Sequence, residues 1–132
     1  MNHGRVPYSE LTLRYFRDAP NAGVLHGPNI GFGTAGTRGC GTEVRFHVQV
    51  VDDRITVARF QAYGCPHVIA VAAWLTEHST GKPANAALPE SIQALQARFS
   101  LPAEKLGRLL IVEDAWIAAI RAAVTKSKPV LE

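Results

Sequence analysis

Hydrophobic and polar residues alternate through residues 43–51, and this spacing of two predicts a β-strand with one buried and one wetted face. Asp52 and Asp53 then supply a polar turn, and residues 55–63 form a second run that predicts the returning strand of a hairpin. The inward face of the first strand is expected to carry Val44, Phe46, Val48 and Val50.

A helix that is apolar nearly all round is predicted directly after this hairpin. Gly64 ends the second strand, Cys65 takes the N-cap position, and Pro66 lies at the first helical position, where proline is favoured. The helix should run to about Thr80. Because residues 68–75 are apolar without interruption, we expect it to be the central buried helix.

Three further helices are predicted from spacings of three and four residues. Residues 8–18 form a short amphipathic segment, and residues 89–99 form another that is stopped by Leu101-Pro102. The longest helix should span about 104–126. Its expected inner stripe consists of Leu106, Leu110, Glu113, Ile117, Ile120 and Val124.

The glycine-rich segment 26–41 predicts a loop with at most one short strand, because glycine is typical of turns and loops. With the hairpin and the helices, this gives an α+β fold in which a small antiparallel sheet is covered by helices. A length of 132 residues is typical of one domain, so we expect residues 1–132 to form a single unit.

Composition narrows the class of protein. Apolar residues make up 47% and charged residues 19%, which is typical of a soluble globular domain. The longest apolar run, 68–75, is too short to span a bilayer, and the first residues lack the apolar segment of a secretory signal, so we expect a cytoplasmic protein. The net charge of +3 comes from scattered residues and does not indicate a nucleic-acid partner.

The two cysteines are the main candidates for chemistry, and in the cytoplasm we expect reduced thiols. Cys65 lies at a predicted helix N-terminus, where N–H groups favour the thiolate that ligates metals or attacks sulfur. Cys40 follows the glycine-rich segment and precedes a strand. The alternative interpretation is that both are small buried hydrophobic residues.

Short motifs with family character occur in order along the chain. They are Tyr8-Ser9-Glu10, Pro20-Asn21-Ala22-Gly23, Cys40-Gly41, Ala58-Arg59-Phe60, Tyr63-Gly64-Cys65, Ile69-Ala70, Thr76-Glu77, Gly81-Lys82, Leu101-Pro102, Lys105-Leu106 and Glu113-Asp114-Ala115. Over about residues 8–126 the chain resembles the IscU/NifU N-terminal family of iron–sulfur cluster assembly scaffolds. The resemblance implies a SufE/NifU-like fold with a three-stranded antiparallel sheet and helices packed on it.

The resemblance also implies a function and a ligand set. Family members take sulfur from a cysteine desulfurase, build a [2Fe-2S] cluster and pass it to apo-proteins. The family ligands are three cysteines, an aspartate and a histidine. The first two cysteines correspond to Cys40 and Cys65, while the aspartate, histidine and third-cysteine positions hold Thr42, Gly107 and Arg108.

Those replacements change the chemistry, since glycine has no side chain to ligate iron and arginine has no lone pair to donate. A [2Fe-2S] cluster normally takes four protein ligands. Two copies of this chain, each giving Cys40 and Cys65, would supply four thiolates, so a homodimer is one expectation. Arg108 either faces the two cysteines, where it would stabilise a thiolate or a persulfide, or points into water.

His67 is a further candidate ligand for iron or zinc, because it lies two residues after Cys65 and histidine is a natural partner of cysteine at such metals. The alternative is a surface histidine in the first turn of the helix. His47 and His78 are expected to be solvated. Phe46, Phe60, Trp74 and Trp116 are expected in the core.

Three hypotheses for function follow. The first is a scaffold that binds iron or a [2Fe-2S] cluster weakly, or across a dimer, through Cys40 and Cys65. The second is a SufE-like acceptor of persulfide sulfur, and the third is a non-catalytic regulator or binding partner of a cysteine desulfurase. A chaperone and apo-protein acceptors are further partners that the resemblance implies. None of the three is an enzyme with its own turnover.

Overall fold

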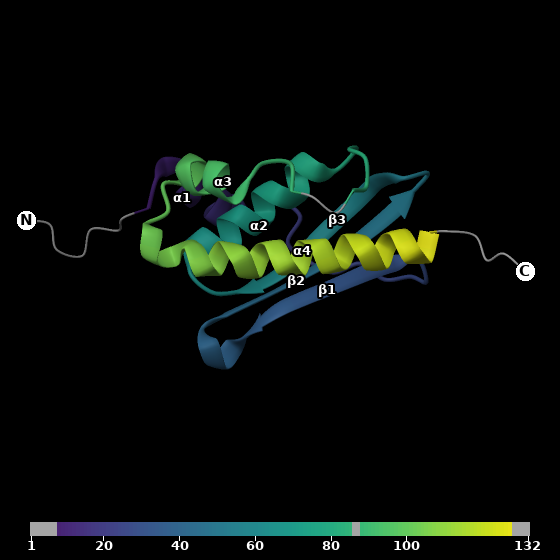
Figure 1. Cartoon of the computed structure of the whole chain (residues 1–132), viewed down its shortest axis with the longest axis horizontal. Coiled ribbons are helices and arrows are strands. Elements are labelled where there is room, and N and C mark those ends of the chain that lie inside the picture. The colour runs from purple at the N-terminus through teal and green to yellow at the C-terminus, as the bar shows by residue number, and fades with distance from the viewer. Residues whose placement is uncertain (1–7, 86–87, 128–132) are drawn as a thin grey trace, which may run out of the picture.

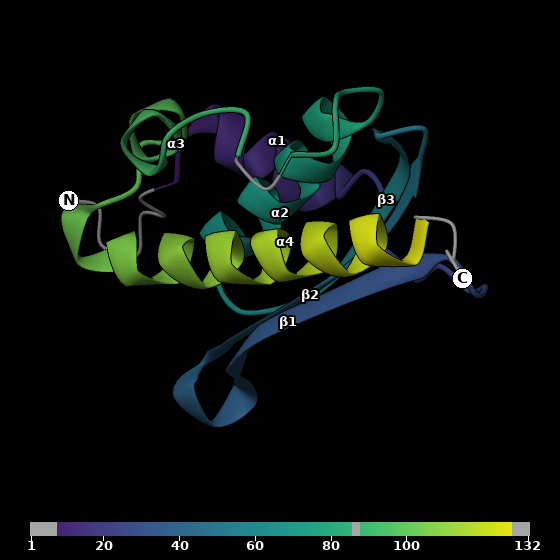
Figure 2. The same ribbon diagram turned by 45° about the vertical axis from the view of Figure 1, so that its right-hand side comes forward.

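The computed structural model describes residues 8–85 and 88–127. Within them, a three-stranded antiparallel sheet in the order β1-β2-β3 carries the helices on one face (Figures 1 and 2). This confirms the α+β class and the three-stranded sheet. In chain order the elements are α1 (Glu10–Asp18), β1 (Ile30–Thr37), the 3-10 turn η1 (Arg38–Cys40), β2 (Thr42–Val51), β3 (Arg54–Tyr63), α2 (Pro66–Ser79), α3 (Ile92–Phe99), the 3-10 turn η2 (Ala103–Lys105) and α4 (Leu106–Ser127).

The predicted hairpin is confirmed. β2 and β3 pair antiparallel with Phe46 opposite Phe60, and both rings are buried beneath the helices. The turn holds Asp52 and Asp53 with positive φ angles of 52° and 61°. Left-handed backbone at both turn residues matches the twist of the flanking strands, and aspartate tolerates it better than most residues.

β1 is the main difference from the sequence prediction, because the segment expected to be loop with at most one short strand contains an eight-residue strand. Its glycines serve close packing against α4. A Cβ at Gly33 would lie 2.2 Å from the Ala115 carbonyl oxygen, and one at Gly31 would lie 2.2 Å from the Ala123 backbone nitrogen. Only glycine lets the strand and the helix approach this closely.

α4 packs on β1 and β2 through a different face from the one predicted. Of the expected stripe only Ile120 is buried, whereas Leu110 is 45% exposed. The buried face lies about one position earlier along the chain than the predicted stripe, because Ala115, Ala119 and Ala123 fit closely against Gly31 and Gly33 of β1. The buried residues of α4 are Leu109, Val112, Ala115, Trp116, Ala119, Ile120 and Ala123.

α2 is the central helix, as predicted. Cys65 is its N-cap, Pro66 its first residue, and its buried positions run all round it. It lies between the sheet and α1, and β3 leads directly into its N-terminus (Figure 1). Trp74 and Trp116 are buried, which confirms the expected aromatic core.

The starts of α1, α3 and α4 lie two or three residues later in the chain than predicted. α3 begins at Ile92, where the Ser91 side chain accepts a hydrogen bond from the N–H of Ala94 and caps the helix. α4 begins at Leu106 because the preceding residues form the 3-10 turn η2. Across the described residues, the helices lack the combination of length and apolar character that a bilayer crossing requires.

Candidate functional site

The Cys65 thiol is half-buried at the N-terminus of α2. Burial alone would raise the pKa of this thiol. The backbone N–H groups of Val68 and His67 and the side chains of Arg108 and Lys105 act in the opposite direction, and the net pKa is lowered from its usual value. The fold therefore favours the thiolate of Cys65, the form that binds metals and attacks sulfur.

Arg108 supplies the nearest of these positive charges. Its Nη1, in the first turn of α4, donates a hydrogen bond at 3.5 Å to the Sγ of Cys65, the N-cap of α2. Arg108 was expected either to face Cys40 and Cys65 or to point into water, and the structure shows it in contact with Cys65. Lys105 lies in the 3-10 turn η2 that leads into α4. The sequence marked it as part of a family motif, but its charge near Cys65 was not expected.

Cys40 is exposed in the 3-10 turn η1 between β1 and β2. Its backbone N–H donates to the Thr37 Oγ1 at 3.2 Å, and Gly41 follows with a φ angle of +90°. Both cysteines are free thiols. Figure 1 shows this turn as the tip of the hairpin that projects from the sheet.

The segments that carry the two cysteines share one hollow. Gly41, which follows Cys40, and Gly64, which precedes Cys65, both line an open hollow of about 400 Å³. Its other lining residues are Ala62, Tyr63 and Ile69. The fold thus brings Gly41 and Gly64 to one hollow, although the two cysteines beside them lie 25 residues apart in the chain.

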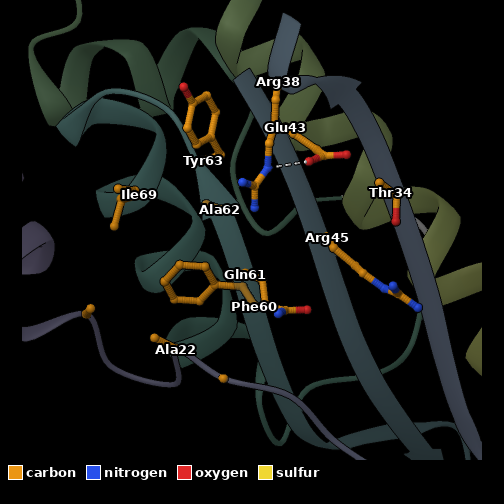
Figure 3. Close-up of a pocket in the computed structure, with 12 residues that line it drawn as sticks. Ala22, Thr34, Arg38, Glu43, Arg45, Phe60, Gln61, Ala62, Tyr63 and Ile69 are labelled. Atoms are coloured by element: carbon orange, nitrogen blue, oxygen red, sulfur yellow. Dashed lines mark hydrogen bonds and ion pairs between the residues drawn. The ribbon is translucent and has the colours of Figure 1, made fainter. Parts of the chain in front are cut away.

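A larger hollow of about 550 Å³ adjoins the first and shares Ala62, Tyr63 and Ile69 with it. Figure 3 shows Arg38 and Glu43 as an ion pair across its upper end, close to the Tyr63 ring. The Arg38 guanidinium lies 5.0 Å from the centre of that ring. Neither cysteine lines this larger hollow, whose lining mixes charged side chains with the apolar side chains of Phe60 and Ile69.

The other family positions provide no further ligand group. Thr42 is 2% exposed at the start of β2, and Gly107 is an exposed position in the first turn of α4. In the part of the chain that the structure describes, there is no group of three or more His, Cys, Asp or Glu side chains that could hold a metal ion. A single chain therefore offers thiolates without a complete ligand set.

His67 is fully buried, so the alternative of a surface histidine is wrong. The Tyr8 ring covers it edge-on, with ring centres 4.6 Å apart. Among the described residues, neither ring nitrogen of His67 has a hydrogen-bond partner. Burial, with the charges of Lys105 and Arg108, lowers the pKa of His67, so its neutral form is favoured.

The expectation that His47 is solvated is also wrong, since its side chain is buried although it stands on the face of the sheet away from the helices. The residues after α1 and the Phe32 ring cover it, and it forms hydrogen bonds with the Leu25 N–H and with Gln61. His78 is exposed as expected and stacks on Trp74.

Residues 7–129 match the model of a protein family described as the NifU-like N terminal domain. The iron-sulfur cluster assembly scaffold protein IscU of Rickettsia prowazekii is 34% identical over 118 residues, which cover 87% of this chain and 90% of that protein. The protein of the same name from Escherichia coli is 31% identical and covers 87% and 92%.

Solved structures agree on the fold. The N-terminal part of a nitrogen-fixing NifU-like protein from Brucella abortus superposes with a TM-score of 0.71 at 18% identity, covering 89% of this chain and 94% of that one. A putative iron-sulfur cluster assembly scaffold protein for the SUF system from Fervidobacterium islandicum gives 0.67 at 19% identity, covering 86% and 96%. Since the family match spans almost the whole chain, this protein belongs to the NifU-like N-terminal domain family.

Proposed function

We propose that this protein acts in iron–sulfur cluster assembly as a scaffold-type protein that binds iron or a [2Fe-2S] cluster weakly through Cys40 and Cys65. The relatives at 31–34% identity carry the name of assembly scaffolds. The observation that carries the proposal is the half-buried Cys65 at the N-terminus of α2, whose pKa is lowered despite burial and whose neighbour Gly64 shares a hollow with the neighbour of Cys40.

The number of ligands requires a second chain. A [2Fe-2S] cluster normally takes four protein ligands, and each chain has two cysteines. The carboxylate and third thiolate of the family are replaced here by Thr42 and Arg108. Two copies that meet at the hollow would supply four thiolates, because Cys40 is exposed on the hairpin tip and can reach a neighbouring molecule.

In this role iron and the cluster are cargo, and the protein has no turnover of its own. A cysteine desulfurase would supply the sulfur, and apo-proteins, with or without a chaperone, would receive the product in the cytoplasm. The role of His67 as a ligand for zinc or iron stays a prediction. Its unpartnered ring nitrogens favour that role, while its complete burial opposes it.

Anaerobic reconstitution with ferrous iron, sulfide and a thiol tests the proposal. We expect a visible absorption band and about one iron per chain, as a [2Fe-2S] cluster shared by two chains requires. The Cys40→Ser and Cys65→Ser variants should each lose the band. A colourless wild-type protein would rule out the scaffold role. Desulfurase binding that survives replacement of both cysteines would then indicate a regulator.

A further inference from the structure

The surroundings of Cys65 are unusually positive for a cysteine that is to bind a metal cation. Arg108 lies in hydrogen-bond contact with its sulfur, and Lys105 adds a second cation from the preceding turn. Both side chains are half-buried, as is the thiol, so water and salt screen these charges less than they would at an exposed pair. The near environment of the sulfur is built for a negative charge.

A second observation lies on the protein side of Cys65. His67 is wholly buried, yet neither of its ring nitrogens has a hydrogen-bond partner within the described residues. The N-terminal end of α2 therefore carries the Cys65 thiol and, two residues later, a buried imidazole that is unpaired among the described residues.

We propose that Arg108 selects an anionic sulfur species over a metal cation at Cys65, so that Cys65 first takes up a sulfur atom as a persulfide and binds iron only after the guanidinium has moved away. The preference of Cys65 for sulfur stands without the proposed function, and only the use of that sulfur in cluster assembly rests on it. Arginine suits this role because it stays charged and has no lone pair to offer a metal.

The transfer step balances without an added oxidant or reductant. The Cys65 thiolate attacks the terminal sulfur of a persulfide donor, R–S–SH, and a new S–S bond forms as the donor S–S bond breaks. The electron pair of the broken bond leaves with the donor as the thiolate R–S⁻, and the proton stays on the transferred sulfur. Cys65 becomes a persulfide whose anion, once deprotonated, still pairs with Arg108.

The same contact weakens metal binding. A cation at the Cys65 sulfur would be repelled by the fixed positive charge of Arg108, and the guanidinium occupies one of the directions from which a metal would approach. Metal binding therefore has to displace a hydrogen-bonded ion pair. This gives a physical reason for a weak iron site in a member of a scaffold family.

Two probes with opposite expected responses test the inference. Glutathione persulfide is the sulfur donor in a Cys40→Ser background, where mass spectrometry follows the gain of one sulfur atom at Cys65. Cobalt(II) alone is the metal probe with both cysteines present, because its thiolate charge-transfer absorption reports sulfur–metal bonding. The variants are Arg108→Gln and Arg108→Lys. The matched control is Arg121→Gln, an exposed arginine further along α4.

We expect Arg108→Gln to slow sulfur uptake several-fold, because the guanidinium that contacts the Cys65 sulfur stabilises negative charge there. The same variant should bind cobalt more tightly. Arg108→Lys should fall between wild type and Arg108→Gln in both assays, and Arg121→Gln should match wild type. Unchanged responses, or responses in the same direction, for both Arg108 variants would overturn the inference.

This result can be separated from that of cluster reconstitution. Opposite shifts of sulfur uptake and cobalt affinity in a protein that forms no cluster would support the role of Arg108 while the scaffold proposal fails. Cluster formation in wild type, together with sulfur uptake and cobalt affinity in the Arg108 variants that equal those of wild type, would support the scaffold proposal and overturn the role of Arg108. Far-ultraviolet circular dichroism of each variant identifies any that has lost the fold.

Discussion

The Cys65 thiol lies between opposing influences whose sum decides its reactivity. Burial favours the neutral thiol, whereas helix N–H groups, Arg108 and Lys105 favour the thiolate, and the second set prevails. The balance depends on a few polar contacts, so single substitutions should shift it measurably. Cys40, exposed at a hairpin tip, makes no comparable contacts with charged groups in the described residues.

The pH dependence of alkylation should reveal this balance. In a Cys40→Ser background we expect the rate of Cys65 alkylation by iodoacetamide to reach its plateau at a lower pH than that of glutathione, because the pKa of Cys65 is lowered. Arg108→Gln should move the midpoint upward. A profile for Cys65 that coincides with that of glutathione would contradict the expected thiolate.

The buried His67 predicts a loss of stability in acid. Its pKa is lowered in the folded state, so the unfolded chain binds a proton more readily as the pH falls below the ordinary histidine pKa of about 6.5. The free energy of unfolding should therefore decrease from neutral pH toward pH 5. His67→Phe should reduce this slope, as measured by urea denaturation at several pH values.

The matched comparison is His47, whose pKa is lowered in the same direction. The His67 variant should therefore keep part of the acid dependence, and a double variant His67→Phe, His47→Phe should lose more of it. If the slope of the His67 variant equals that of wild type, protonation of this buried ring does not contribute to the acid sensitivity.

The elements differ in how far local sequence specifies them. Alternating residues predicted the β2–β3 hairpin, and the Gly64-Cys65-Pro66 junction predicted the start of α2. β1 was missed because its glycines leave no hydrophobic period to detect. The buried face of α4 does have a helical period, through Leu109, Val112 and Trp116, but the predicted stripe lay about one position further along the chain.

The candidate site, too, could be predicted only in part from the local sequence. Cys65 could be placed at the N-cap from sequence alone, but the direction of Arg108 could not, since α2 and α4 meet only through tertiary packing. The burial of His67 depends on Tyr8, which approaches from 59 residues earlier in the chain. Contacts of this kind carry no local pattern.

A glycine-to-alanine substitution is expected to change the free energy of unfolding in opposite directions at Gly33, where β1 packs on α4, and at Gly107, which has open space. Gly33→Ala would place a methyl group 2.2 Å from the Ala115 carbonyl oxygen, so we expect a loss of about 1–3 kcal/mol or more in unfolding free energy. Gly107→Ala has open space around it in the first turn of α4 and should gain about 0.5–1 kcal/mol.

Chemical denaturation of the two variants beside wild type measures both effects. Gly39→Ala, which has no atom closer than 4.0 Å to the added carbon, serves as the neutral control in an exposed turn. A Gly33→Ala variant as stable as wild type would mean that α4 can move away from β1 without cost, contrary to the close packing seen here.

In the whole molecule, the helices cover one face of the sheet (Figure 2), and Gly41 and Gly64, the neighbours of the two cysteines, line one hollow. This layout leaves the hollow open to a second copy. We expect the protein to be monomeric before reconstitution and dimeric when it holds a cluster, as measured by light scattering after size-exclusion chromatography under anaerobic conditions.

Removal of the cluster with a chelator should return the monomer, and Cys40→Ser should abolish the dimer, because each chain would then offer a single thiolate. A dimer that persists in both cases would show that contacts other than the cluster hold the two chains together. It would also separate the oligomeric state from the chemistry of the cysteines.

The close packing of Gly31 and Gly33 against α4 has a mechanical consequence for the site. Because Gly31 and Gly33 have no side chains, the backbone of β1 lies close against α4 from Ala115 to Ala123, and Arg108 lies about two to four turns from these contacts on the same helix. The two glycines thus set the shortest possible separation between β1 and α4. A methyl group at either position would push α4 away from the sheet, move the Arg108 guanidinium away from the Cys65 sulfur, and so lower the reactivity of a thiol that the substitution does not touch.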